Sequence, residues 1–329
     1  MERWTNEEEK YLIDNYMDTM YCDIAKALNK TEGAIRAKCF ELQLVKNNAW
    51  TEDEILFLKN NYNKLSVKEI AEYLNRTPNS VRLKANKSGC KKSPYNCDYN
   101  FFKTIDTEDK AYWLGFIAAD GWVTITPESN SGSVGIELMH SDIKHLSKFN
   151  KSIHGNYKIT TRDKKCKIST QPEKTHKMCQ IRVFSIDMVN DLRQFGISPN
   201  KTYEFNLPNF SDNLMRHFIR GYFDGDGCVR TRKYKLASGV VVEYPLCDIA
   251  SVNNIFLEQL REYLYRELGI CSYIYLEQSG VYRLCIHKNE HTIKFLNYMY
   301  DNTKLFLDRK YNKYLSIIND DVINESLAN

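Results

Sequence analysis

Two short segments, residues 112–121 and 217–227, share one pattern and constrain the fold of this chain of 329 residues more than any other feature. Each reads as an apolar helix that carries a glycine, a small residue four places later, and then Asp-Gly. Residues four apart lie on one helix face, and a glycine inside a helix costs roughly 1 kcal/mol relative to alanine, so its presence needs a packing reason. We therefore expect the two helices to pack closely through Gly115 and Ala119 in the first segment and Gly221 and Gly225 in the second.

This packing places the acidic residues of the two segments, Asp120 and Asp226, side by side at the helix ends. We expect the glycine that follows each of them to take the left-handed cap conformation. Two adjacent carboxylates repel unless a cation lies between them, and Mg²⁺ is a hard cation that prefers oxygen ligands. The alternative for either segment alone is a simple helix stop, but the duplication favours a divalent-metal site.

The two segments resemble the paired motifs of single-chain LAGLIDADG homing endonucleases. The first matches the nine-letter pattern at Gly115, Ile117, Ala119, Asp120 and Gly121, and the second at Gly221, Asp224, Asp226 and Gly227, with Gly225 in the second Ala position. Trp113 and Ala118 depart from the pattern at positions that carry no chemistry in the family. The resemblance implies an α+β fold of two αββαββα half-domains, related by a pseudo-twofold axis, whose antiparallel sheets form a saddle for double-stranded DNA.

The resemblance also implies the site residues. Asp120 and Asp226, with the backbone carbonyls of Ala119 and Gly225, are expected to bind Mg²⁺ or Mn²⁺. One basic residue per half, Lys201 in the first and Lys310 in the second, is expected to polarise the attacking water or to stabilise the charged transition state. The alternative that each is an ordinary solvent-exposed lysine stays open.

The first 92 residues contain a tandem repeat, in which Trp4-Thr5 recurs as Trp50-Thr51 and the two copies align from there without a gap. Each copy reads as three short helices. In the second copy, Thr77 is the expected cap and Pro78 opens the third helix. Three helices with a capped, basic third member resemble Myb/SANT-like helix-turn-helix modules, which place that helix in the DNA major groove. Some SANT-like modules bind protein tails instead, and that alternative stays open.

Basic residues are expected to contact DNA in both parts of the chain. The formal net charge is only +4, but residues 73–97 contain no acid, and the predicted strands after each motif are basic. The expected DNA-binding residues are Arg36, Lys38, Asn79, Arg82 and Lys84 in the repeats and Arg162, Lys165, Arg182, Arg230 and Arg232 in the strands.

The predicted domain organisation follows the motifs. We expect helix-turn-helix repeats at 1–46 and 47–92, a linker at 93–105, and half-domains at 106–209 and 210–329. Within the half-domains, helices are expected at 142–153, 187–195 and 254–268, and strands at 134–139, 157–168, 178–184, 229–235, 240–250, 272–276 and 281–286.

Composition excludes several other classes of protein. The ten cysteines include no Cys-x-x-Cys pair, which argues against zinc. No apolar run is long enough to span a membrane and no signal peptide is recognisable, so we expect a cytoplasmic protein with no membrane partner. The resemblance to the single-chain enzymes implies a monomer.

The expected function is a site-specific DNA endonuclease, a homing enzyme, that makes a staggered double-strand break by Mg²⁺-dependent phosphodiester hydrolysis. The chain starts with Met1 and has no His before Asn329, so a free-standing enzyme is expected rather than an intein. Two alternatives stay open: a non-catalytic transcriptional regulator, against which the retained acidic pair argues, and an intron maturase, for which intron RNA is a further partner.

Overall fold

The computed structural model describes residues 4–17, 19–44, 49–90, 92–129, 131–165, 175–199, 205–235, 239 and 241–328. The chain divides into two compact units, Met1–Pro94 and Tyr95–Asn329, which we call the arm and the core unit. In the described part of the chain, no helix combines the length and the apolar character that crossing a bilayer requires.

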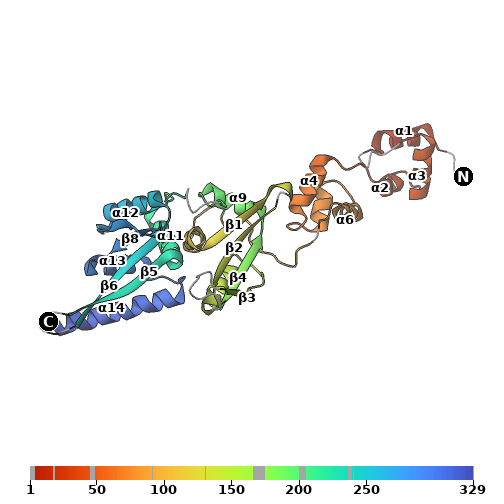
Figure 1. The fold of residues 1–329 in the computed structure, drawn as a ribbon. Helices are drawn as coiled ribbons and strands as arrows, with labels where there is room; N and C mark the ends of the chain where they lie inside the picture. The colour runs from red at the N-terminus through yellow and green to blue at the C-terminus, as the bar shows by residue number, and fades with distance from the viewer. Residues whose placement is uncertain are drawn as a thin grey trace. The chain divides into compact units, whose positions relative to one another are not determined.

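The arm consists of two three-helix modules, repeat 1 and repeat 2 (Figure 1). Their helices are α1 (Asn6–Asn15), α2 (Tyr21–Ala27) and α3 (Glu32–Glu41) in repeat 1, and α4 (Glu52–Asn61), α5 (Val67–Tyr73) and α6 (Pro78–Lys87) in repeat 2. Thr5 and Thr51 each form a capping box with the glutamate three residues later, so the Trp-Thr start that the two copies share is a helix start.

Each repeat has its own small core, built from equivalent positions of the two copies. The buried residues are Leu12, Ile24, Ala25, Ile35 and Cys39 in repeat 1, and Leu58, Ile70, Ala71, Val81 and Ala85, together with Tyr62, in repeat 2. The internal repeat in the sequence is therefore a repeat of the same three-helix packing.

The core unit contains the same succession of elements twice, and the expected fold class is confirmed. The first half comprises α7 (Glu108–Ala119), β1 (Gly121–Thr126), the short helix η1 (Pro127–Ser129), β2 (Ser131–Met139), η2 (His140–Asp142), α8 (Ile143–Ser152), β3 (Thr160–Lys165), β4 (Thr175–Phe184) and α9 (Ile186–Gln194). The second comprises α11 (Asp212–Asp226), β5 (Gly227–Lys235), β6 (Val241–Ser251), α12 (Asn254–Leu268), β7 (Tyr273–Leu276), β8 (Tyr282–Ile286), α13 (Asn289–Tyr300) and α14 (Asp308–Ala328).

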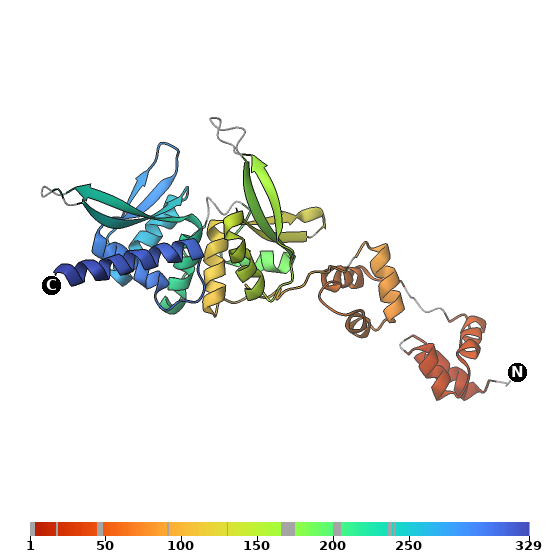
Figure 2. The ribbon, with the colours of Figure 1, turned by 90° about the horizontal axis from the view of Figure 1, so that it is seen from below.

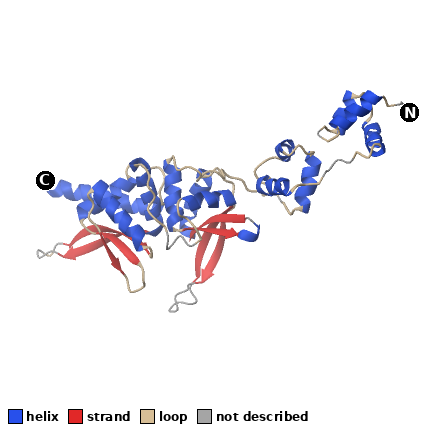
Figure 3. Cartoon of the chain, turned by 90° about the horizontal axis from the view of Figure 1, so that it is seen from above, coloured by secondary structure: helices blue, strands red, loops and turns tan. Residues whose placement is uncertain are grey.

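Each half builds one four-stranded antiparallel sheet. The strand order is β1-β2-β4-β3 in the first sheet and β5-β6-β8-β7 in the second, so the halves share one topology. Helices α8 and α9 pack on the first sheet, and α12 and α13 on the second. In Figure 3 the helices of the core unit lie on one side and the strands of both sheets on the other, so each sheet has one face turned away from the helices.

Three expectations from the sequence differ from the structure. Strand β1 was not expected, because it follows α7 directly and no turn residues separate the two. Residues 95–105, expected to be a linker, belong to the core unit: Phe101 and Phe102 are buried, and the Asp98 amide donates to Ile153 O (2.7 Å). The strand expected at 157–168 begins later, because β3 starts at Thr160 and residues 157–159 are not in a strand, and residues 166–168 lie outside the described residues.

Each half of the core unit forms hydrogen bonds with a segment near the end of the other half, residues 206–207 of the first and residues 306–308 of the second. In the first half, Lys148 of α8 donates to the backbone oxygen of Phe306 (2.8 Å) and pairs with Asp308 (2.6 Å). In the second half, Gln259 of α12 accepts from the Leu207 amide (2.8 Å) and donates to the Asn206 side chain (3.0 Å). One continuous apolar core runs through both halves, so they form a single folded body (Figure 2).

Candidate metal centre and basic surfaces

Helices α7 and α11 pack backbone against backbone, as the small residues in the sequence predict. A Cβ built on Gly115 would lie 2.1 Å from the backbone oxygen of Phe218, and one on Gly221 would lie 1.9 Å from that of Tyr112. Such distances leave no room for any side chain. The glycine in each motif is therefore required by the helix pair.

The ends of the two helices meet at the acidic residues. A Cβ on Gly225 would lie 2.4 Å from the Ala119 Cβ and 3.6 Å from the Asp120 Cβ, so the last turn of α11 packs directly on the last turn of α7. Asp120 caps α7, and Asp226 is the last residue of α11. The paired motifs thus place both carboxylates at one end of the helix pair.

The glycines after these aspartates have a different role from the expected one. Neither Gly121 nor Gly227 has a positive φ, and Gly227 is extended, with φ −83° and ψ 160°. Instead, a Cβ on Gly121 would lie 2.7 Å from Ile117 Cα, and one on Gly227 would lie 2.2 Å from the Phe223 ring. Glycine is needed because the chain passes from helix into strand without a loop, folding tightly over the last helical turn.

The electrostatic surroundings confirm that the two carboxylates share one neighbourhood. Burial raises the pKa of Tyr222, and the charges of Asp226 and Asp120 both contribute to that shift. The same two carboxylates both act on the Lys310 ammonium. Two side chains on different elements therefore experience both acids at once.

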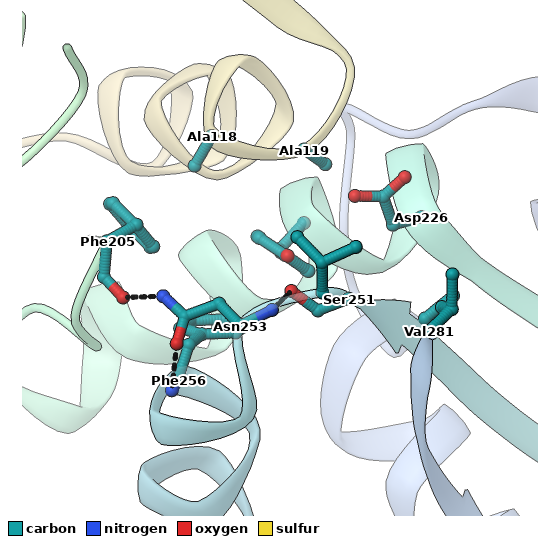
Figure 4. A pocket seen from close by; sticks show the side chains of 11 residues that line it. Ala118, Ala119, Phe205, Asp226, Ser251, Asn253, Phe256 and Val281 are labelled. Atoms are coloured by element: carbon teal, nitrogen blue, oxygen red, sulfur yellow. Dashed lines mark hydrogen bonds between the residues drawn. The ribbon is translucent and has the colours of Figure 1, made fainter. Parts of the chain in front are cut away.

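A cavity of about 290 Å³ opens beside this point, and Figure 4 shows part of its lining. Asp226 and Ala119 lie at one side of it, and the Asp226 carboxylate points toward α7. Ser251, Asn253 and Phe256 line the opposite side. One member of the acidic pair, Asp226, therefore borders this cavity.

Lys310 is placed close to the acidic pair, but its contacts differ from those expected. It is only 5% exposed, and its Nζ donates to the backbone oxygens of Asp224 (2.8 Å), Gly225 (3.3 Å) and Gly227 (2.6 Å), and also to that of Phe223. Burial lowers its pKa to about 8, although the neighbouring Asp224 carboxylate opposes the shift. The lysine stabilises the end of α11, where carbonyls lack helical partners. It is not the solvent-facing lysine of the alternative.

Asp224 is a buried residue whose importance the sequence did not reveal beyond its match to the motif. Its carboxylate accepts from the Tyr112 hydroxyl (2.7 Å), the Tyr300 hydroxyl (2.5 Å) and the Leu307 amide (2.8 Å). Burial raises its pKa, and the charge of Lys310 together with these donors opposes the shift. Asp224 thus ties α7, α13 and the start of α14 to α11. The first motif has Ala118 at the equivalent position, where it lines the cavity.

The donor set at the helix ends fits a hard divalent cation. Two carboxylates lie where the C-terminal ends of two helices converge, and each helix end adds partial negative charge and backbone carbonyl oxygens. The carbonyl of Gly225 already accepts a long hydrogen bond from Lys310 (3.3 Å), whereas its second lone pair can face an ion. Within the described ranges, no group of three or more His, Cys, Asp or Glu side chains could hold a metal ion, so the site depends on this acidic pair and backbone oxygens.

The expected lysine of the first half, Lys201, lies outside the described residues. Of the two lysines predicted from the sequence, the described residues include Lys310 but not Lys201.

Except for Lys165, which the register of β3 places on the other face of its sheet, the basic residues of the sheets lie on the faces turned away from the helices. Their charges are not equally available. Arg162 pairs with Glu137 (2.8 Å), which also pairs with Lys164 (3.1 Å). Arg230 pairs with Asp248, a buried acid that also binds Arg283 (2.5 Å). Lys165 and Arg232 are exposed on β3 and β5. Arg182 of β4 is exposed and pairs with no described carboxylate.

The arm residues also divide into two groups. In repeat 1, Lys38 is 8% exposed and pairs with Glu9 (2.6 Å) and Glu41 (2.9 Å), so it stabilises the module instead of facing outward as expected. Arg36 is exposed and pairs with Glu32 (2.9 Å). In repeat 2, Arg82 and Asn79 are exposed on α6, a helix without acids, and Lys84 is half-buried over the Trp50 ring.

Comparison with known families and structures finds similarities to LAGLIDADG proteins. Residues 213–300 match the family model described as a LAGLIDADG-like domain. A search of curated proteins found no significant match. The structure is similar to the LAGLIDADG meganuclease I-AabMI bound to uncleaved DNA (TM-score 0.44, 13% identity, covering 65% of this chain and 91% of that one). It is also similar to the I-LtrWI LAGLIDADG homing endonuclease bound to target DNA (TM-score 0.46, 10% identity, covering 69% and 92%).

Proposed function

We propose that this chain is a site-specific DNA endonuclease of the LAGLIDADG homing type, which makes a staggered double-strand break by Mg²⁺-dependent phosphodiester hydrolysis. The observation that carries the proposal is the meeting of Asp120 and Asp226 at the ends of two helices in backbone contact. The match of residues 213–300 to the LAGLIDADG-like domain supports it. Because one chain contains both halves, it acts as a monomer on an asymmetric target.

In this mechanism the chain's own residues bind the cation and set its position. Asp120 and Asp226 supply the charged ligands, and Ala119 and Gly225 supply backbone oxygens at the same helix ends. When bound, Mg²⁺ activates water for attack on a phosphodiester and stabilises the leaving oxygen. Lys310 acts on α11: its four hydrogen bonds to backbone oxygens fix the turn from which Asp226 projects.

DNA binding follows from the two exposed sheet faces. Strands β1 and β5 begin directly after Asp120 and Asp226, so each sheet extends away from the acidic pair on its own side. This arrangement suits a duplex that crosses the pair and is contacted in both directions. Lys and Arg contacts to phosphate supply affinity, and side chains that reach base edges supply specificity. Repeat 2 of the arm adds a further contact through the acid-free helix α6.

The test is cleavage by the full-length chain. The substrate is a plasmid carrying an intronless copy of the gene that neighbours the coding sequence, incubated with Mg²⁺. The proposal expects one linear product whose mapped ends are staggered, and no product in EDTA. Specific binding of this DNA without any cutting would instead favour the non-catalytic regulator, and neither binding nor cutting would leave only the maturase alternative.

A further inference from the structure

A row of three residues crosses the exposed face of the first sheet, two residues beyond Asp120. Trp122 of β1 pairs with Gly135 of β2, and Gly135 pairs with Arg182 of β4. Neighbouring strands lie about 4.8 Å apart, so side chains on β1 and β4 meet only if nothing stands between them. A Cβ on Gly135 would lie 2.1 Å from the Trp122 indole. The missing side chain of Gly135 therefore lets the indole lie across β2 and reach Arg182.

Arg182 is held on several sides. Its guanidinium lies 5.2 Å from the centre of the Trp122 ring and 4.8 Å from that of Phe184, an aromatic residue that is 61% exposed. Its Nε donates to Ser133 Oγ (2.9 Å), and Ser133 in turn bonds Thr124 Oγ1 (2.7 Å). Aromatic faces attract a cation without neutralising it, and the hydroxyl fixes the plane of the fork. The side chain is thus oriented while its charge stays available.

In the second sheet, the position equivalent to Gly135 carries a charged side chain instead of none. Gly135 precedes Ile136, which pairs with Gly121, and Asp248 precedes Ile249, which pairs with Gly227. Asp248 therefore occupies the place of Gly135. Its buried carboxylate binds Arg230 and Arg283, and Glu277 also binds Arg283. These internal ion pairs neutralise the charges of Arg230 and Arg283 at the centre of the second sheet, whereas Arg182 in the first sheet forms no ion pair with a described carboxylate.

The chemistry that suits this arrangement is the major-groove edge of guanine. Arginine has five N–H donors. In Arg182 two of them are used: Nε donates to Ser133, and one terminal nitrogen makes a weak contact with Thr124 (3.5 Å). The remaining donors on the two terminal nitrogens match guanine O6 and N7, the commonest specific pairing of arginine with a base. We propose that Arg182, oriented by Trp122, Phe184 and Ser133, selects a guanine in the half-site bound by the first sheet. This inference rests on the proposed DNA-binding function.

The test begins with the sequence preference of the full-length chain. A pool of randomised duplexes is selected for binding in EDTA, so that no divalent ion supports cleavage, and the enriched motif is read by sequencing. Binding is then measured to the enriched duplex and to duplexes in which single guanines are replaced by adenine or by 7-deazaguanine, which lacks the N7 acceptor. For one guanine, the wild-type chain should lose about 5- to 150-fold in affinity with adenine, and a smaller factor with 7-deazaguanine, which keeps the O6 acceptor.

Three variants identify the residue responsible. Arg182→Ala should bind the enriched duplex more weakly and become insensitive to both replacements at that guanine, while every other position keeps its preference. Trp122→Leu, which keeps the arginine but removes one face that orients it, should retain only part of the discrimination. The control Lys151→Ala, an exposed change in α8, should keep the full preference at that guanine. Thermal unfolding of each variant confirms that it is folded.

The outcomes separate this inference from the proposed function. If Arg182→Ala keeps the wild-type response to 7-deazaguanine at every position, the inference is overturned, and the endonuclease proposal stands on its own cleavage assay. If the predicted dependence on Arg182 is found but Mg²⁺ produces no cutting, the inference holds and the endonuclease proposal fails. A wild-type chain that enriches no motif overturns both.

Discussion

Gly115 and Gly221 occupy reciprocal positions in the core unit, each against the backbone of the helix that carries the other. The atoms that a β-carbon would meet are the carbonyl oxygens of Phe218 and Tyr112, at 2.1 Å and 1.9 Å. Ordinary carbon contacts begin near 3.5 Å. The spacing of the helix pair, and with it the spacing of Asp120 and Asp226, is therefore set by main-chain atoms that cannot rotate away.

The first prediction follows from this spacing. Gly115→Ala and Gly221→Ala should each lower the free energy of unfolding by at least the roughly 1–3 kcal/mol typical of overpacking, because the obstructing atom is backbone. Both should also lose cleavage, since separated helices separate the carboxylates. Denaturant unfolding followed by circular dichroism measures the first effect. Gly33→Ala is the matched control, because the nearest atom to its added Cβ is 3.9 Å away, and it should be tolerated.

The second prediction concerns the acidic pair. Asp120→Asn and Asp226→Asn should each slow Mg²⁺-dependent cleavage by more than about 100-fold, because each removes a charged ligand without changing side-chain shape. Affinity for the duplex enriched in EDTA should stay within a few-fold of wild type. Asp14→Asn, an exposed change in α1, serves as the control. A single Asn variant that cuts at the wild-type rate would remove that aspartate from the site.

The third prediction concerns Lys310. Lys310→Met should lower stability at pH 7 by about 1–3 kcal/mol, because buried backbone oxygens at the end of α11 lose their donor. Cleavage should slow by about 10²- to 10³-fold, since Asp226 is no longer held in place. Normal cleavage in a variant with reduced stability would assign the lysine a structural role only.

The pH dependence of stability gives an independent measure of the same lysine. Its pKa is lowered from 10.5 to about 8 in the folded protein by burial, so between these values the unfolded chain binds the proton and the folded protein does not. Stability therefore rises with pH through this window. Wild type should gain up to about 3 kcal/mol relative to Lys310→Met between pH 8 and 10.5. A constant difference across that range would show that folding does not lower the pKa of Lys310.

The fourth prediction separates the two repeats of the arm. Arg82→Ala should reduce the slope of log affinity against log salt by about 0.9, the value for one phosphate contact. Lys38→Ala should leave that slope unchanged and instead lower the stability of repeat 1, because Lys38 is paired inside the module with Glu9 and Glu41. Equal slopes for Arg82→Ala and wild type would show that α6 does not contact phosphate.

The parts of the structure that could be predicted from sequence are those encoded by local spacing. The small residues four apart in the two motifs predict the helix pair, and the aligned Trp-Thr starts predict the helices of the arm. Strand β1 was missed because Gly121 continues directly from α7 into the sheet, and no loop residues mark the change. The role of that glycine was also missed, since only the packed structure shows its contact with Ile117.

Other features depend on contacts between segments far apart in the chain. The burial of Lys310 requires the start of α14 to lie against the end of α11, which no local pattern encodes. The contact of Trp122 with Arg182 requires the register of three strands, with Gly135 between them. Lys38 looked equivalent to Lys84 in the aligned repeats, but repeat 1 has Glu41 three residues later, where repeat 2 has Lys87.

Each half of the core unit forms hydrogen bonds with a segment near the end of the other half, and these contacts limit how halves can be exchanged between proteins. Gln259 in the second half binds Asn206 and Leu207 from the first, and Lys148 in the first binds Phe306 and Asp308 from the second. A chimera that joins one half of this chain to a half from another protein replaces one member of each of these pairs. In a chimera, two pairs of segments must therefore come from the same parent protein, although each pair has one member in each half. These pairs are α12 with residues 205–207, and α8 with residues 306–308. A graft that respects these pairs keeps the register of the core, whereas a cut at the midpoint of the duplication breaks both at once.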